Sequence, residues 1–519
     1  MIRRCTALIL TLIMAGATLT NCNRRNETFV MALEAAPRTL DPLRGFDASS
    51  ERFRQLMFNS LVKKNERFEY VGELATDIQR ADDGLSYTFK LRDDVKFHDG
   101  KLLTSADAKY TFDKLLASDS QKAASFYQGA GANRKPHVAS IEAPDPQTLV
   151  IRLHDPWLEL LTNLVPTAII PAGTFETQEQ QPLGSGPYKF VRFDQSQGIV
   201  DMEANDNYWE GAPTIKALRV SVILDANSQQ AGLQSGRVNL AINTALTPDA
   251  YVGLAQHPDL KVEQAPGVNI QYFGFNTESA PLTDARVRRA IAYAVNRESL
   301  VRDLLQGQAR IAHSMIPEES WAYTSGQKYG YDPAQAKKLL DEAGFRDSDG
   351  DGPKMRLPAP LVFKISATNA IARQSAGVIQ NALKEVGVPV SIETLEDNTL
   401  REAMTKGQYQ LTIGRWVGGN QDPIFLRDLF TNLGGGNFNR SRFNNAELNR
   451  VLGQAVATPG GTDQARDLYR QAQEIISREM PTLPLWYPNN MIVARRNVSN
   501  IKVDPGGDWK FVRLLTLEK

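Results

Sequence analysis

Strand and helix patterns alternate along most of this chain, and this alternation limits the folds open to it. Tyr87–Arg92 alternates apolar and polar side chains and predicts a half-buried strand, and Thr148–Leu153 predicts another. Thr104 starts a capping box in front of one helix, and Asp463–Met480 predicts a longer helix. We therefore expect α/β domains with mixed sheets. A chain of 519 residues is too long for one hydrophobic core, so two or three domains are expected.

The second half of the chain carries clear helix boundaries. Thr283 is expected to cap one helix, and Asp332-Pro333 to begin another that ends at Gly344. Ile371–Val386 predicts a third helix. The arginines from Arg286 to Arg297 are expected on a solvated, salt-bridged helix face. Two further strands are expected at Val388–Ile392 and Tyr409–Ile413.

The N-terminus has the pattern of an export signal. Arg3 and Arg4 precede the apolar run Ala7–Leu19, which is too short to span a bilayer. The run ends in Leu19-Thr20-Asn21-Cys22, which resembles a bacterial lipobox apart from Asn21. We expect residues 1–21 to be a signal peptide and residues 22–28 a tether, with Cys22 lipidated. Cleavage after Ala17 by an ordinary signal peptidase is the alternative.

Charge and motif content argue against several classes of function. Basic and acidic residues balance at 59 each, so we expect no nucleic-acid binding. The sequence contains no HExxH, CxxC, GxSxG or GxxxxGKS/T motif, and its five histidines are scattered. We therefore expect no enzyme activity, no cofactor and no metal site. The acidic run Asp347–Gly352 resembles the start of a calcium loop, but Pro358 stands where the last ligand is needed.

Eight segments occur in one order along nearly the whole chain after the tether. They are Thr39–Pro42, Phe58–Val62, Tyr87–Gly100, Gly184–Phe190, Asn207–Pro213, Phe273–Thr277, Val287–Arg297 and Trp416–Pro423. The most specific of them is the stretch that starts at Tyr87. Together they resemble the peptide- and nickel-type (family 5) extracellular solute-binding proteins of ABC importers, which include oligopeptide- and dipeptide-binding receptors. The sparse histidines argue against nickel as the solute.

The resemblance implies a two-lobed α/β fold like that of periplasmic binding proteins of class II. Mixed sheets, a hinge and an extra inserted subdomain belong to this fold. The chain would cross between the lobes near Tyr272 and Tyr487. We expect lobe I to comprise residues 29–55, 180–272 and 488–519, the inserted subdomain residues 56–179, and lobe II residues 273–487.

The resemblance also implies a function in transport. The protein would capture a peptide in its cleft, close around it, and deliver it to an ABC permease whose separate subunits hydrolyse ATP. We expect a monomer in the periplasm or at the cell surface, held to a bacterial membrane by its lipid. An oligosaccharide or a glutathione-like compound is the alternative ligand. An exported hydrolase or chaperone is the alternative function.

Two segments carry the binding site that the resemblance implies. The strand Tyr272–Thr277 and the loop Trp416–Asn420 would line the cleft, where a peptide backbone would pair with protein strands. Trp416 would form an aromatic wall or, equally, pack in the core. The candidate ligand-binding residues are Glu34, Tyr272, Phe273, Phe275, Asn276, Arg415, Trp416, Val417, Gly418, Gly419, Asn420 and Asp422.

One position departs from the family pattern. Peptide-binding relatives place an Asp three residues after this Trp to pair with the α-ammonium of the ligand, whereas this chain has Gly419. Asp422 is a possible substitute, although Asp422-Pro423 is typical of a helix start. Glu34 is another. The departure leaves N-blocked and modified peptides as further candidate ligands.

Overall fold

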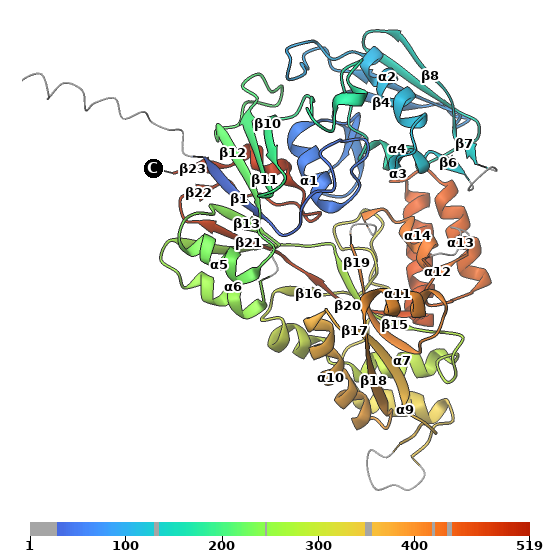
Figure 1. The fold of residues 1–519 in the computed structure, drawn as a ribbon. Coiled ribbons are helices and arrows are strands. Elements are labelled where there is room, and N and C mark those ends of the chain that lie inside the picture. Colours follow the sequence, from blue (N-terminus) through green and yellow to red (C-terminus); the bar gives the residue numbers. More distant parts are fainter. Residues whose placement is uncertain are drawn as a thin grey trace, which may run out of the picture.

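The computed structural model describes residues 28–128, 134–243, 246–347, 355–417, 421–432 and 438–518. Among these residues, two large sheets form the centres of two lobes (Figure 1). Both sheets contain parallel and antiparallel neighbours. This arrangement confirms the two-lobed α/β fold with mixed sheets that the sequence predicts.

The sheet of the first lobe is assembled from three distant parts of the chain. Its first strand pairs in parallel with two strands of the middle segment, and a strand from near the C-terminus completes it. In sheet order the strands are β10 (Tyr188–Asp194), β11 (Ile199–Ala204), β12 (Ala217–Val222), β1 (Phe29–Leu33), β13 (Leu240–Ile242), β21 (Asn490–Arg495) and β14 (Leu260–Ala265). The lobe also contains α1 (Ala48–Met57), α5 (Ala226–Gln234), α6 (Pro248–Ala255), β22 (Val498–Ser499), η5 (Trp509–Leu514) and β23 (Thr516–Leu517).

A subdomain follows α1 and is built on a sheet of four strands. In sheet order they are β4 (Ala75–Arg80), β5 (Ser86–Leu91), β9 (Thr148–Leu153) and β8 (Val138–Asp145), which confirms both strands expected here. The Asp107 carboxylate accepts a hydrogen bond from the Thr104 backbone N–H at 3.0 Å, as the predicted capping box requires. The other elements are β2 (Val62–Lys64), β3 (Tyr70–Gly72), α2 (Ser105–Leu116), α3 (Gln121–Ala124), β6 (Tyr127–Gln128), β7 (Lys135–Pro136), α4 (Leu160–Leu164) and η2 (Phe175–Thr177).

The second lobe is continuous in sequence apart from the residues outside the described ranges. In sheet order its strands are β16 (Ala309–Ile311), β20 (Thr482–Pro488), β15 (Ile270–Phe275), β19 (Leu411–Trp416), β17 (Leu361–Ser366) and β18 (Val390–Leu395). Its helices are α7 (Ala285–Ala294), α8 (Arg297–Ser299), η3 (Leu300–Leu304), α9 (Pro333–Glu342), α10 (Ala370–Glu385), α11 (Asp397–Thr405), α12 (Phe425–Phe430), α13 (Ala446–Ala457) and α14 (Asp463–Glu479).

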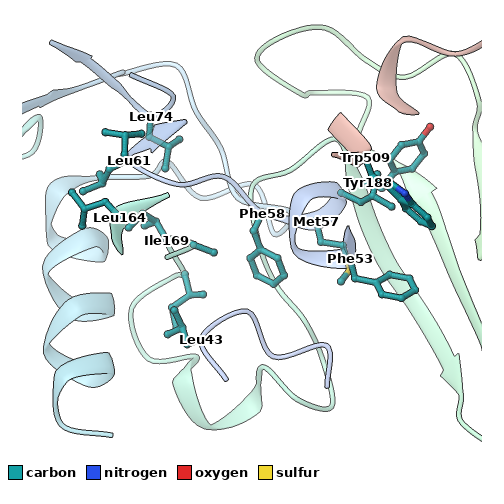
Figure 2. Close-up of a cluster of buried hydrophobic side chains, with 14 of the residues drawn as sticks. Leu43, Phe53, Met57, Phe58, Leu61, Leu74, Leu164, Ile169, Tyr188 and Trp509 are labelled. Carbon is teal, nitrogen blue, oxygen red and sulfur yellow. The ribbon is translucent and has the colours of Figure 1, made fainter. Parts of the chain in front are cut away.

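Buried aromatic side chains join the distant segments of the first lobe. Figure 2 shows Phe53 and Met57 of α1 lying together with Tyr188 of β10 and Trp509 of η5. All four side chains are almost fully buried, and the Phe53 and Trp509 ring centroids are 6.4 Å apart. Each large apolar side chain buried in this way contributes roughly 1.5–3 kcal/mol. The C-terminal segment is therefore an integral part of the first core.

The two chain crossings between the large sheets lie side by side. One runs through residues 266–269, and the other passes through Asn489, between β20 and β21. A Cβ atom added at Gly267 would lie 2.1 Å from the Pro488 carbonyl oxygen, so the two crossings are in close contact. The Asn489 side-chain amide donates to Gln264 Oε1 at 2.8 Å. The expected crossing points Tyr272 and Tyr487 lie just inside the second sheet.

Several local boundaries differ from the sequence expectations. Asp284, and not Thr283, caps α7, because its carboxylate accepts the backbone N–H of Arg286 at 2.8 Å. Strand β18 begins two residues later than expected, at Val390. Strand β19 is shifted to Leu411–Trp416, so Trp416 ends a strand and does not begin a loop.

Two arginines of the expected solvated face are buried instead. Arg288 and Arg297 are only 3% and 2% exposed, because backbone carbonyls surround their guanidinium groups. Arg286 does lie at the surface, paired with Asp284 at 2.6 Å. Arg288 donates to the carbonyls of Leu282, Thr283, Glu479 and Met480, and Arg297 to those of Ala312, Tyr329 and Pro484.

Within the described ranges, none of the helices combines the length and apolar character needed to cross a bilayer. The same ranges contain no group of three or more His, Cys, Asp or Glu side chains placed to hold a metal ion. Most of the acidic run Asp347–Gly352 lies outside the described residues.

Candidate functional site

Two cavities lie where the lobes face each other. The first, which we call the arginine cavity, measures about 720 Å³ and is lined by Arg401, Arg415 and Arg440. The first lobe contributes Leu246–Asp249, at the start of α6, to its wall. The second lobe contributes the end of β19, the N-terminal part of α10 and one side of α11. Both lobes therefore enclose this space.

The second cavity, which we call the tyrosine cavity, measures about 630 Å³. Tyr70 and Tyr87 line it from the subdomain, and Trp321 and Tyr469 line it from the second lobe. Helix α14 carries Tyr469 and helix α4 carries Thr162 on the opposite wall. A change in the angle between the lobes would thus alter both cavities.

Trp416 is held between an aromatic ring and a cation at the end of β19. Its ring stacks on Tyr272, with centroids 6.3 Å apart and an interplanar angle of 14°. The Arg440 guanidinium carbon lies 4.6 Å from the Trp416 ring centroid. Tyr272 and Gly414 are direct partners across β15 and β19, and a Cβ atom at Gly414 would lie 2.3 Å from the Tyr272 ring. The absence of a side chain there makes room for the stack.

The other predicted site residues near Trp416 fall into two groups. Arg415 is exposed and lines the arginine cavity, and Val417 is 57% exposed. Gly418, Gly419 and Asn420 lie outside the described residues. Trp416 itself is partly buried against the core of the second lobe.

Strand β15 has no free edge to which a peptide could add as a further strand. It pairs with β19 on one side and β20 on the other. Phe273 and Phe275 are fully buried in the second core. The Asn276 side-chain amide donates to the carbonyls of Gly407 and Tyr409, both at 2.9 Å. These side chains hold the lobe together at this point.

Both candidate carboxylates are already engaged. Arg52 donates to both oxygens of Glu34, at 2.8 and 2.9 Å. Asp422 Oδ1 accepts the backbone N–H of Ile424 at 3.0 Å, which fixes the turn before α12. The N-cap of α12 is nevertheless Ile424, so Asp422 caps a turn and not the helix itself.

Asp422 also joins the lobes, a role that sequence reasoning missed. Its Oδ2 accepts hydrogen bonds from the hydroxyls of Tyr70 and Thr162, the second at 2.9 Å. Nearby, Glu159 of the subdomain pairs with Arg427 of α12 at 3.1 Å. The subdomain residues carry no motif, and only the folded arrangement brings them to the second lobe.

The comparison with protein families agrees with this architecture. A model described as "Bacterial extracellular solute-binding proteins, family 5 Middle" matches residues 69–438. The chain belongs to this family. This family 5 protein is 30% identical over 490 residues to Heme-binding protein A of Haemophilus influenzae, a match that covers 89% of this chain and 87% of that protein.

A second relative links the family 5 protein to a solved structure. This chain is 29% identical over 496 residues to the oligopeptide-binding protein AppA of Bacillus subtilis, and the match covers 91% of this chain and 88% of AppA. The solved structure of AppA in complex with a nonapeptide aligns with a TM-score of 0.69 and 26% identity. That alignment covers 95% of this chain and 99% of AppA. The similarity therefore extends over both lobes.

Proposed function

We propose that this protein is the substrate-binding component of an ABC importer, which captures peptides by hinge closure and delivers them to a membrane permease. The observation that carries the proposal is that both lobes line each cavity while the chain crosses between the lobes at two adjacent points. A rotation about those crossings would open or close both cavities together.

Ligand binding would drive this closure through contacts shared by the lobes. A ligand favours the closed arrangement only through contacts that exist mainly in that arrangement. Thr247 faces the arginine cavity from one lobe and Arg415 from the other, as Tyr70 and Tyr469 do in the tyrosine cavity. A solute that touches both sides gains these contacts on closure. No bond is made or broken in this role, and the closed surface is the form that the permease would recognise.

Peptides are the solute class that we favour. One relative is named an oligopeptide-binding protein, and its solved structure holds a nonapeptide. The two cavities fall within the roughly 300–1,000 Å³ typical of small-ligand sites. Because both edges of β15 are occupied, we expect the peptide backbone to bond with strand ends and loops, and not to extend the second sheet. A glutathione-like compound or an oligosaccharide is the alternative ligand.

The N-terminal signal supports a location outside the cytoplasm. Residues 1–21 would be removed, and a lipid on Cys22 would tether the mature protein, as a monomer, to a bacterial membrane. A variant with Cys22→Ala should then leave the membrane fraction. Recovery of that variant in the same fraction as the wild type would contradict lipid anchoring.

Native mass spectrometry of protein isolated from its host tests the ligand class. A mixture of short-peptide masses released from the protein would support the proposal. One oligosaccharide mass, or haem, would overturn the peptide assignment and keep the receptor role. A thermal-shift panel of peptides, glutathione, maltooligosaccharides and haemin tests the receptor role itself, because any ligand of the native state raises the Tm. No shift with any of them, or turnover of the peptides, would reject it.

A further inference from the structure

A third, much smaller cavity lies within the second lobe. It measures about 20 Å³, which is room for one small ion or one water molecule. Segments far apart in the chain form its wall, namely α8, the loop of residues 312–332 between β16 and α9, and parts of α12, α14 and β20. Among the described residues it shares no lining side chain with the arginine or the tyrosine cavity. A species bound here would therefore connect distant parts of one lobe.

The Arg297 side chain lines this cavity as a buried charge without an ionic partner. It is 2% exposed, and its two terminal nitrogens donate to three backbone carbonyls. Within the described part of the chain it forms no ion pair, and the carboxylate of Glu298, which acts on it, belongs to an exposed residue. Burial lowers the pKa of Arg297 to about 10. Buried charges are usually paired, because an unpaired charge is costly to remove from water.

Two nitrogen atoms of the residues around the cavity are also without partners. Among the described residues, neither Arg297 Nε nor His313 Nδ1 has a hydrogen-bond partner, although both atoms are buried and both side chains line the cavity. Arg Nε–H is always a donor, and imidazole Nδ1 is a donor in one neutral tautomer. Burial, and then the charges of Arg297 and Lys328, lower the pKa of His313, which agrees with a positive potential here. Two donors beside an uncompensated cation favour a small anion.

From this combination we propose that the cavity binds one chloride ion as the counterion of Arg297. Arg297 Nε–H and His313 Nδ1–H would donate to the ion, on the side of the guanidinium group that the three carbonyls leave free. A water molecule could accept the same bonds, but it would leave the buried charge uncompensated. The ion would join α8 to the loop 312–332, which carries Trp321 into the tyrosine cavity. This inference does not depend on the proposed function, because it concerns the stability of the second lobe.

The test is thermal unfolding of the full-length protein in sodium chloride and in sodium gluconate at the same ionic strength. Gluconate is too large for the cavity and controls for screening by salt. Raising chloride from about 1 mM to about 100 mM should increase the Tm by about 2–5 °C, because the ion binds only the folded protein. Bromide should act like chloride. His313→Leu should lose most of this dependence whatever its own Tm, whereas His154→Leu, at an exposed histidine of the subdomain, should keep all of it.

A crystal grown in bromide should show an anomalous scattering peak between Arg297 and His313. Equal Tm values in chloride and gluconate would overturn the chloride site, as would full chloride dependence in His313→Leu. A water molecule at this place in the bromide crystal would overturn it too. None of these results would affect the receptor role, which is decided by ligand binding to the same protein.

Discussion

Asp422 and Tyr70 lie on opposite lobes, and the Tyr70 hydroxyl donates a hydrogen bond to Asp422 Oδ2. Thr162 donates to the same oxygen at 2.9 Å, while Oδ1 accepts the Ile424 N–H at 3.0 Å. One carboxylate therefore fixes a turn in the second lobe and holds the subdomain against it. These groups can meet only when the lobes are together.

Replacing Tyr70 with Phe should shift the ligand-free protein toward an open form. A hydrogen bond to a charged group contributes about 1.5–3 kcal/mol, so the closed population should fall about tenfold or more. Small-angle scattering would detect this as a larger radius of gyration. Tyr127→Phe is the control, because its hydroxyl donates to the Leu116 carbonyl within the subdomain. An unchanged radius for Tyr70→Phe would show that the bond does not hold the lobes together.

Gly414→Ala should displace the Tyr272 ring and disturb its stack with Trp416. The added Cβ would lie 2.3 Å from Tyr272 atoms, which is far closer than normal contact. We expect a loss of about 1–3 kcal/mol in unfolding free energy, together with a change in tryptophan fluorescence. Gly253→Ala, inside helix α6 and with nothing within 4 Å of the added atom, should leave the fluorescence unchanged and should not lower the stability. Wild-type fluorescence and stability in Gly414→Ala would contradict the packing described for this strand pair.

Arg297→Lys should destabilise the second lobe although it keeps the charge. The guanidinium donates to three carbonyls, those of Ala312, Tyr329 and Pro484. One ammonium cannot reach all three in the same geometry, and each buried acceptor left unpaired costs about 1–3 kcal/mol. Chemical denaturation should report a loss of roughly 2–4 kcal/mol. Arg286→Lys, at the exposed pair with Asp284, should have an unfolding free energy within about 0.5 kcal/mol of the wild type. An equal loss of stability in both variants would refute the argument.

His98 should make stability depend on pH in the weakly acidic range. Burial lowers its pKa from 6.5 to about 4, and in its neutral form the ring bonds to the Gly186 carbonyl oxygen at 3.0 Å. Between these two pKa values the unfolded chain binds more protons than the folded one, so stability falls as pH drops from 6.5 toward 4. The effect should be about 2–3 kcal/mol.

The check is a comparison of unfolding free energies at pH 7 and pH 4.5. His98→Gln should lose less stability on acidification than the wild type does. His154→Gln, at an exposed histidine, should behave like the wild type. The His98 argument fails if both variants lose as much stability as the wild type.

Local signals in the sequence predicted the elements whose boundaries they set. The capping box of Thr104 and Asp107 and the start of α9 at Pro333 lie at their predicted positions. Both depend only on interactions between residues that are close in sequence. The family resemblance supplied the two-lobed arrangement. Arg288 and Arg297 could not be predicted, because the carbonyls that bury them come largely from strands and loops far along the chain. A run of arginines on a helix is otherwise typical of a solvated surface.

The candidate site was predicted less well than the fold. The contact between Asp422 and Tyr70 spans 352 residues of sequence, so no local pattern reports it. Glu34 and Asp422 were candidate partners for a ligand ammonium group, yet each is engaged by residues that the sequence does not link to it. Arg415, which borders the arginine cavity, was anticipated only through its place beside Trp416.

The position of β21 between β13 and β14 determines when the first lobe can complete its folding. Until the final segment of the chain is synthesised, that sheet lacks an inner strand and Trp509 is missing from its core. The second lobe needs only the residues up to Pro488. Folding should therefore run against chain order, with the later-encoded lobe forming first and the N-terminal lobe closing last, because its contacts require the longest loop closures.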